Sequence, residues 1–107
     1  MDIEKLKALG SEWIKGGFHR IYFGREALRK IIGLELNFYN TGNVSSAYQD
    51  GELISNTKAN KLMLRTDFSS IFFDVNSGEF KHSENTNIEF FENIKSILIK
   101  RVGFGNE

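Results

Sequence analysis

The segment Leu34-Glu35-Leu36-Asn37-Phe38-Tyr39 carries the clearest strand pattern in the chain. Its apolar residues alternate with polar ones, and this period of two is typical of a half-buried β-strand. Leu36 and Phe38 should therefore face the core. Tyr39 should face the solvent.

The residues after this strand predict a β-meander over residues 34–54. Asn40-Thr41-Gly42-Asn43 has the composition of a turn, and a second strand follows from Val44 to Gln49. Asp50-Gly51 is a typical two-residue hairpin turn, so Glu52–Ile54 should pair back onto the second strand.

Upstream of the meander, the pattern predicts a helix, a strand and another helix. Apolar residues recur at helical spacing over residues 2–15 and place Trp13 on the core-facing stripe. Gly16-Gly17 should end this helix. The aromatic run 18–23 favours a strand, and residues 25–32 favour a short helix.

Downstream of the meander, the pattern predicts a helix, a hairpin and a final helix. Ser55 or Asn56 is a suitable N-cap for the first of these helices. The final helix should begin with a capping box, in which Thr86 is the N-cap and Glu89 reaches back to it. The expected elements are a helix over about residues 57–66, strands over 70–75 and 79–83, and a helix ending near Val102.

These elements indicate an α+β fold. Strands joined by hairpins favour an antiparallel sheet, and the helices must cover its apolar face. The length of 107 residues fits one domain. We therefore expect a single domain over residues 1–107, with one antiparallel sheet of five or six strands packed with about four helices.

The composition excludes several classes of protein. Fourteen basic residues balance fourteen acidic ones, which argues against a highly basic nucleic-acid protein and against an acidic mimic of DNA. The absence of cysteine excludes disulfide scaffolds, thiolate catalysis and cysteine-ligated zinc. No apolar run approaches the ~20 residues of a membrane span, and the first residues do not resemble a signal peptide. We expect a cytoplasmic protein that does not contact membranes.

Motifs for catalysis are missing from the sequence. His19 and His82 lack the spacing of a metal site, and no serine lies in a Gly-x-Ser-x-Gly elbow. Gly16-Gly17 lies between an expected helix and an expected strand, which is the wrong context for a dinucleotide-binding loop. We therefore expect a protein that is not an enzyme and uses no metal or cofactor.

The strongest surface pattern is a basic cluster interleaved with aromatic residues. On the expected strand 18–23, Arg20 and Tyr22 should point away from Ile21 and Phe23. Such a patch can grip phosphates, stack bases or dock on an acidic protein, although it can also be a solvated face. Its members are Arg20, Tyr22, Arg25, Arg29 and Lys30.

Two further charged segments stand out. The expected hairpin tip from Tyr48 through Asp50 to Glu52 is acidic and carries one aromatic ring. A protruding hairpin is a common protein-binding device, although this composition is also that of an ordinary hairpin. Lys58, Lys61 and Arg65 share one face of an expected helix. We interpret that second basic set as a solvated face.

Three segments together resemble small uncharacterised proteins of phages and mobile elements. These are Glu12–Phe23, Asp50–Asn56 and the turn Phe73–Gly78. The resemblance implies an accessory protein without catalytic activity. It implies, in particular, an inhibitor of host defence of the anti-CRISPR kind.

Three hypotheses follow. The first is a protein-binding inhibitor that contacts a host protein or ribonucleoprotein complex. The second is a small nucleic-acid-binding protein that uses the basic and aromatic patch between Arg20 and Lys30. The third is a homodimer, because several aromatic residues should face away from the core. Those outward aromatic residues are Phe18, Tyr22, Tyr39 and Phe72, and the expected partner-binding residues are Arg20, Tyr22, Arg25, Tyr48 and Asp50.

Overall fold

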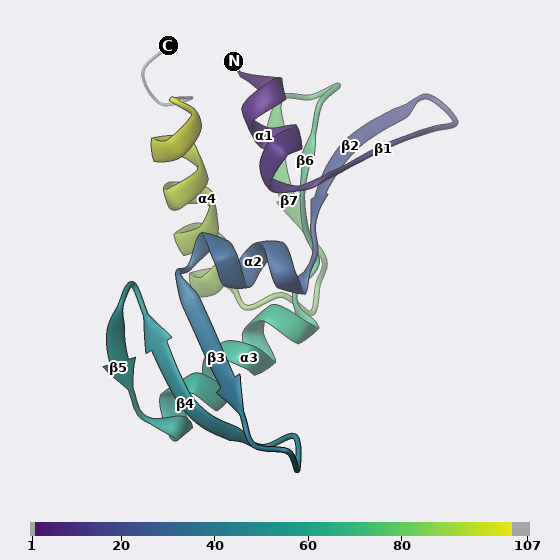
Figure 1. Cartoon of the computed structure of the whole chain (residues 1–107). Helices are drawn as coiled ribbons and strands as arrows, with labels where there is room; N and C mark the ends of the chain where they lie inside the picture. The colour runs from purple at the N-terminus through teal and green to yellow at the C-terminus, as the bar shows by residue number, and fades with distance from the viewer. Residues whose placement is uncertain (1, 104–107) are drawn as a thin grey trace.

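The computed structural model describes residues 2–103, and over this range it shows four helices and seven strands (Figure 1). The α+β class and the number of helices expected from the sequence are confirmed. In chain order the elements are α1 (Ile3–Leu9), β1 (Ser11–Lys15), β2 (Phe18–Phe23), α2 (Arg25–Ile31), β3 (Leu34–Phe38), β4 (Val44–Gln49), β5 (Glu52–Ile54), α3 (Asn56–Phe68), β6 (Ile71–Asp74), β7 (Glu79–His82) and α4 (Ile88–Val102).

The strands form two antiparallel sheets, so the expectation of one sheet with five or six strands was wrong. A four-stranded sheet has the order β1-β2-β6-β7, and a three-stranded sheet has the order β3-β4-β5. The chain leaves β2 through α2 and returns to β6 through α3. Because β6 pairs with the edge of β2 that β1 leaves open, the meander does not pair with β2, and it forms a sheet of its own.

One cluster of buried apolar side chains joins the helices to both sheets. Ile21 and Phe23 of β2 enter it, as the alternation in that strand predicted. Leu34 brings the three-stranded sheet into the same cluster. The longest helix contributes most, and the other members are Leu6, Leu28, Ile31, Ile32, Ile71, Phe73, Phe90, Phe91, Ile94, Leu98 and Val102.

The first helix is shorter than the sequence predicted. It ends at Leu9, with Gly10 as its C-cap, and residues 11–15 form β1 instead of continuing the helix. A Cβ atom on Gly10 would lie 2.6 Å from the carbonyl oxygen of Tyr22. The glycine thus lets the chain pass close against β2 and turn into a hairpin. As a consequence Trp13 is on a strand and 39% exposed.

Two local predictions also need correction. Phe38 is 52% exposed instead of buried, because the pairing of β3 with β4 shifts register between Asn37 and Phe38. The N-cap of α4 is Asn87, whose side chain accepts a hydrogen bond from the Phe90 backbone. The Thr86 hydroxyl is instead hydrogen-bonded to the backbone of Ser70.

Candidate functional site

The outer face of the four-stranded sheet gathers aromatic side chains around one arginine. Directly paired residues of antiparallel strands share a face, and the register pairs Trp13 with Arg20 and Tyr22 with Phe72. Ile21 and Phe23 occupy the opposite, core-facing side. We refer to Trp13, Phe18, Arg20, Tyr22 and Phe72 as the aromatic face.

Arg20 lies among the four rings of this face. Its guanidinium carbon is 4.7 Å from the centre of the Phe18 ring and 4.7 Å from that of Phe72. The Trp13 ring lies 6.0 Å away, across the strand pair. Arg20 Nη1 donates a hydrogen bond to Tyr22 Oη at 3.0 Å, which helps to hold the guanidinium group in this position. Among the described residues, Arg20 Nε is buried without a hydrogen-bond partner.

The rings also contact one another. Tyr22 and Phe72 lie 5.2 Å apart between ring centres, and Trp13 meets Tyr22 edge-on at 6.2 Å. Trp13 and Phe18 nonetheless remain 39% and 51% exposed. Rigid, partly exposed tryptophan, tyrosine and arginine side chains are the types enriched at binding hot spots.

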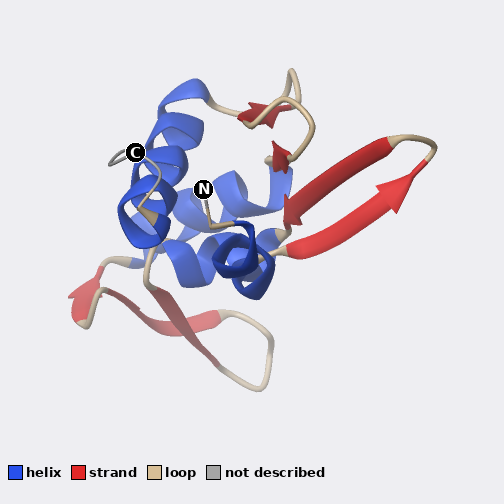
Figure 2. Ribbon diagram, turned by 90° about the horizontal axis from the view of Figure 1, so that it is seen from above, coloured by secondary structure: helices blue, strands red, loops and turns tan. Residues whose placement is uncertain are grey.

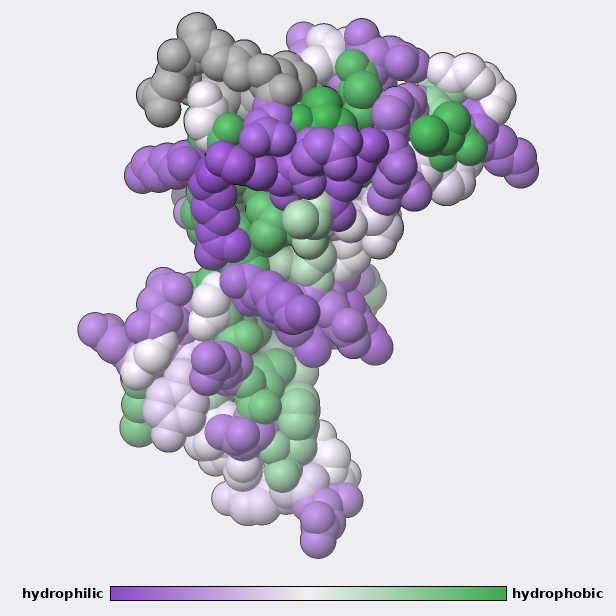
Figure 3. Space-filling model, turned by 45° about the horizontal axis from the view of Figure 1, so that its top comes forward, coloured by the Kyte–Doolittle hydropathy of each residue, from purple (hydrophilic) through white to green (hydrophobic). Residues whose placement is uncertain are grey.

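The hairpin that carries much of this face projects from the body of the molecule. Figure 2 shows β1 and β2 extending away from the gathered helices. Every residue of β1 is exposed. The turn consists of Gly16 and Gly17, both with positive φ, as the tight two-residue hairpin requires. In Figure 3, hydrophobic patches break the hydrophilic surface at this end of the molecule.

An ion pair borders the aromatic face on β6 and β7. Lys81 Nζ lies 3.4 Å from Asp74 Oδ2, and the Asp74 carboxylate also accepts backbone hydrogen bonds from Asn76 and Ser77. Desolvation raises the pKa of Asp74, but the bonds from Ser77 and Lys81 outweigh it, so the net pKa is lowered. The ionised Asp74, which is the cross-strand partner of Arg20, is therefore paired with Lys81 at the border of the face.

A second charged cluster lies on the core-facing side of the same hairpin, next to α1. Glu12 Oε2 is 2.7 Å from His19 Nε2 and 3.1 Å from Lys7 Nζ. The hydrogen bonds from His19 and Lys7 lower the pKa of Glu12, and the bond to Glu12 raises the pKa of Lys7. This cluster ties α1 to both strands of the projecting hairpin.

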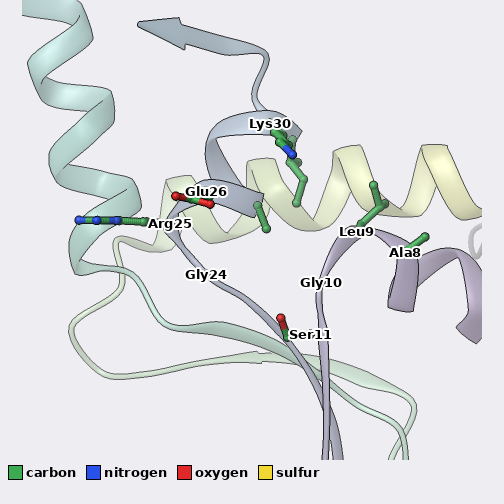
Figure 4. Close-up of a pocket in the computed structure, with 10 residues that line it drawn as sticks. Ala8, Leu9, Gly10, Ser11, Gly24, Arg25, Glu26 and Lys30 are labelled. Atoms are coloured by element: carbon green, nitrogen blue, oxygen red, sulfur yellow. The ribbon is translucent and has the colours of Figure 1, made fainter. Parts of the chain in front are cut away.

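The residues of the basic patch expected between Arg20 and Lys30 lie apart in the structure. Arg29 is engaged by α3, where Nη2 lies 2.9 Å from Asp67 Oδ1. Arg25 and Lys30 line an open cavity of about 460 Å³ between α1 and α2 (Figure 4). Glu26 lies in the same cavity lining, so its carboxylate offsets part of the positive charge.

Tyr48 and Asp50 lie on the other sheet and are not brought together with Arg20. Tyr48 is half-buried on β4, paired with Glu35 on one side and with Leu53 on the other. Asp50 begins the β4–β5 turn at a φ of 52°, and its backbone N–H donates to the Gly33 carbonyl at 2.9 Å. The five expected partner-binding residues thus occupy three places, and only Arg20 and Tyr22 are in contact.

Trp13 is a member of this site that the sequence pattern did not predict. Its spacing from Leu6 and Leu9 matched a helix, so the ring was assigned to the core. The outward direction of Phe18, Tyr22 and Phe72 was predicted from strand alternation and is confirmed. Gly10 and the Gly16-Gly17 turn together were the available signal that a hairpin, rather than a long helix, precedes β2.

Both histidines have partners within the fold. His19 is held by Glu12, and the His82 ring lies 4.4 Å from the Phe91 ring. Across residues 2–103, no three His, Asp or Glu side chains lie together in a way that could hold a metal ion. Within the same range, no helix combines the length and apolar character needed to cross a bilayer.

Comparison of the chain with family models, curated proteins and solved structures gives no match.

Proposed function

We propose that this chain is a binding protein without catalytic activity, which docks on a host protein through the aromatic face. The observation that carries this proposal is the position of Arg20, held among four rings on an exposed sheet face. Preorganised side chains lose little conformational entropy on binding, so more of the contact energy remains as affinity. A net charge of zero favours contact by shape over attraction by bulk charge.

The resemblance of three segments to phage and mobile-element proteins indicates the class of partner. We infer an inhibitor that occludes a working surface of a host defence complex, such as a CRISPR–Cas protein or ribonucleoprotein. Occlusion requires a rigid contact surface and no reacting groups. The projecting β1–β2 hairpin is suited to reach into such a complex.

A two-variant comparison tests this function. Tagged full-length protein is expressed in bacteria that carry an active CRISPR–Cas system, and plasmid interference and co-purified proteins are measured. We expect the wild type to suppress interference and to recover a stoichiometric partner. Trp13→Ala with Phe18→Ala should abolish both effects.

The matched control is Leu53→Ala, which removes a side chain that is 70% exposed on the other sheet. It should leave suppression and recovery intact. Circular dichroism must first show that every variant is folded. Intact suppression by the folded double variant, or no stoichiometric partner for the wild type, would refute docking through the aromatic face.

Binding of single-stranded nucleic acid is a second candidate function. Exposed rings beside an arginine can stack bases, and Lys15 lies on the same strand pair as Phe18. This function requires affinity for oligonucleotides that falls steeply as salt rises, because phosphate contacts release counterions. Binding weaker than about millimolar at low salt would exclude it.

A homodimer is the third possibility, in which a second copy of the chain binds to the aromatic face. Pairing two aromatic faces would bury Trp13 and Phe18, and it would form a symmetric contact. Light scattering across micromolar concentrations distinguishes this case. A constant mass near 12.3 kDa excludes the dimer, whereas a mass that doubles and returns to 12.3 kDa in the Trp13→Ala, Phe18→Ala variant supports it.

A further inference from the structure

A second surface, separate from the aromatic face, lies along α3 where it meets the start of α4. Two adjoining hollows of about 240 and 380 Å³ share Lys61 and Arg65 in their lining. Lys58 extends the second hollow toward the start of α3. We call this surface, formed by Lys58, Lys61, Leu64, Arg65 and Phe68, the α3 groove.

The positive charge of the α3 groove is not neutralised within the fold. Within residues 2–103, none of Lys58, Lys61 and Arg65 forms an ion pair, although Arg29 of the neighbouring helix is paired with Asp67. Glu89 is the one acidic residue that lines either hollow. The groove therefore presents three cations against one carboxylate.

Apolar side chains lie beside these cations. Leu64 and Phe68 are one helical turn apart and are 55% and 70% exposed, and both line the first hollow. Leu62 and Phe90 line the second. Leu64 and Phe68 thus adjoin in one apolar patch rimmed by cations, and apolar patches with a polar rim are typical of interaction sites.

We propose that the α3 groove binds an acidic peptide segment that carries an apolar anchor. The unpaired cations match carboxylates by charge, and Leu64 and Phe68 match an aliphatic or aromatic side chain between them. Asn85 and Asn93 line the two hollows and supply amide groups suited to a peptide backbone. Nucleic acid is less favoured, because Phe68 is the one exposed ring among the residues that line the two hollows, whereas binding of a single strand uses several rings on which successive bases stack.

The test uses a random-peptide display library selected on the immobilised full-length chain. The enriched peptides are synthesised, and their dissociation constants are measured by fluorescence anisotropy. We expect at least two acidic residues beside an apolar one in the enriched set. Lys61→Glu with Arg65→Glu should weaken binding at least tenfold, and Leu64→Ser with Phe68→Ser should weaken it comparably.

The control for charge is Lys30→Glu with Lys100→Glu, which makes the same change in net charge at exposed positions outside the groove. It should alter binding less than threefold. Enrichment of no acidic peptide, or an equal loss in the groove and control variants, would overturn the proposal. Competition by a thymidine oligonucleotide at equal affinity, with no apolar anchor in the selected peptides, would overturn it in favour of nucleic acid.

The aromatic face and the α3 groove can fail separately. Peptide binding that survives Lys61→Glu with Arg65→Glu but is lost in Trp13→Ala with Phe18→Ala would place the ligand on the aromatic face. That result refutes the groove and leaves the proposed function standing. The converse result is suppression that persists in the folded Trp13→Ala, Phe18→Ala variant together with peptide binding that is lost only in Lys61→Glu with Arg65→Glu, and it would refute the proposed function and support the groove.

Discussion

The Arg20 guanidinium lies 4.7 Å from the centre of the Phe72 ring, and this contact joins β2 to β6 across the exposed side of the sheet. A second ring, that of Phe18, approaches the same guanidinium at the same distance. A planar guanidinium stacks on aromatic rings in a way that the compact ammonium of lysine cannot reproduce. The arginine thus contributes to the stability of the sheet as well as to its surface.

Replacing this arginine by lysine should therefore lower the free energy of unfolding. Arg20→Lys loses the stacked contacts and the hydrogen bond to Tyr22, which together contribute about 1–2 kcal/mol. Urea denaturation measures the change. Arg25→Lys is the control, because Arg25 is exposed, and it should stay within about 0.5 kcal/mol of the wild type. Equal stability of the two variants would contradict the stacked geometry.

Gly10→Ala should destabilise the protein strongly. The added Cβ would lie 2.6 Å from the Tyr22 carbonyl oxygen and 2.9 Å from side-chain atoms of Ile21 and Phe23. Such overpacking costs about 1–3 kcal/mol, measurable by thermal or urea denaturation. Gly24→Ser provides the comparison, since nothing beyond the chain neighbours lies within 4 Å of its added Cβ and serine is a favourable N-cap for α2, so it should lower stability by less than about 0.5 kcal/mol. A harmless Gly10→Ala would mean that α1 and β2 are not in close contact.

The two ends of β3 should respond differently to truncation. Leu34 is buried in the shared core, whereas Phe38 is 52% exposed. Leu34→Ala should cost about 2–4 kcal/mol, and Phe38→Ala less than about 1 kcal/mol. Chemical denaturation of both variants checks the register of the meander. A loss for Phe38→Ala as large as that for Leu34→Ala would mean that Phe38 shares the buried face with Leu34 and that the register shift before Phe38 is absent.

Lowering the pH should remove the contribution of the Glu12 carboxylate to the stability of the folded protein. Its pKa in the folded protein lies below the ordinary value of 4.5, because His19 and Lys7 stabilise the charged carboxylate. This contribution is complete above pH 4.5 and disappears as the pH falls through the lowered pKa. The melting temperature of the wild type should exceed that of Glu12→Gln at pH 7, and the difference should shrink between pH 4.5 and pH 3.

Asp74 also has a lowered pKa, but it is present in both proteins and cancels in that comparison. A difference in melting temperature that stays constant from pH 7 to pH 3 would exclude the Glu12 carboxylate as the titrating group.

Local patterns predicted the elements whose geometry is set by near neighbours in the chain. Alternation placed Ile21 and Phe23 inward, and Asp50-Gly51 formed the predicted hairpin with both residues at positive φ. Ser55 caps α3 by accepting a hydrogen bond from the Lys58 backbone. These features depend on backbone sterics and on a few adjacent residues, so they could be derived without the tertiary fold.

The errors arose where distant contacts decide the structure. Thr86 and Asn87 are both suitable caps, and the choice is made by Ser70, whose N–H and carbonyl hydrogen-bond to the Thr86 hydroxyl. Trp13 lies on a strand instead of the expected helix because Gly10 packs against β2 and ends the helix before it. The pairing of β2 with β6 likewise decides which residues surround Arg20, and no local pattern predicts such a pairing.

That pairing also sets an order of events during folding. The β1–β2 and β6–β7 hairpins form from local contacts, on the scale of about 1–10 μs, while closing the long loop between β2 and β6 is entropically slower. Phe72 lies beside Arg20 only when β2 and β6 are paired. A nascent or partly unfolded copy displays Trp13 and Phe18 without a fixed arginine between them. A partner that requires the complete arrangement would thus discriminate mature chains from immature ones.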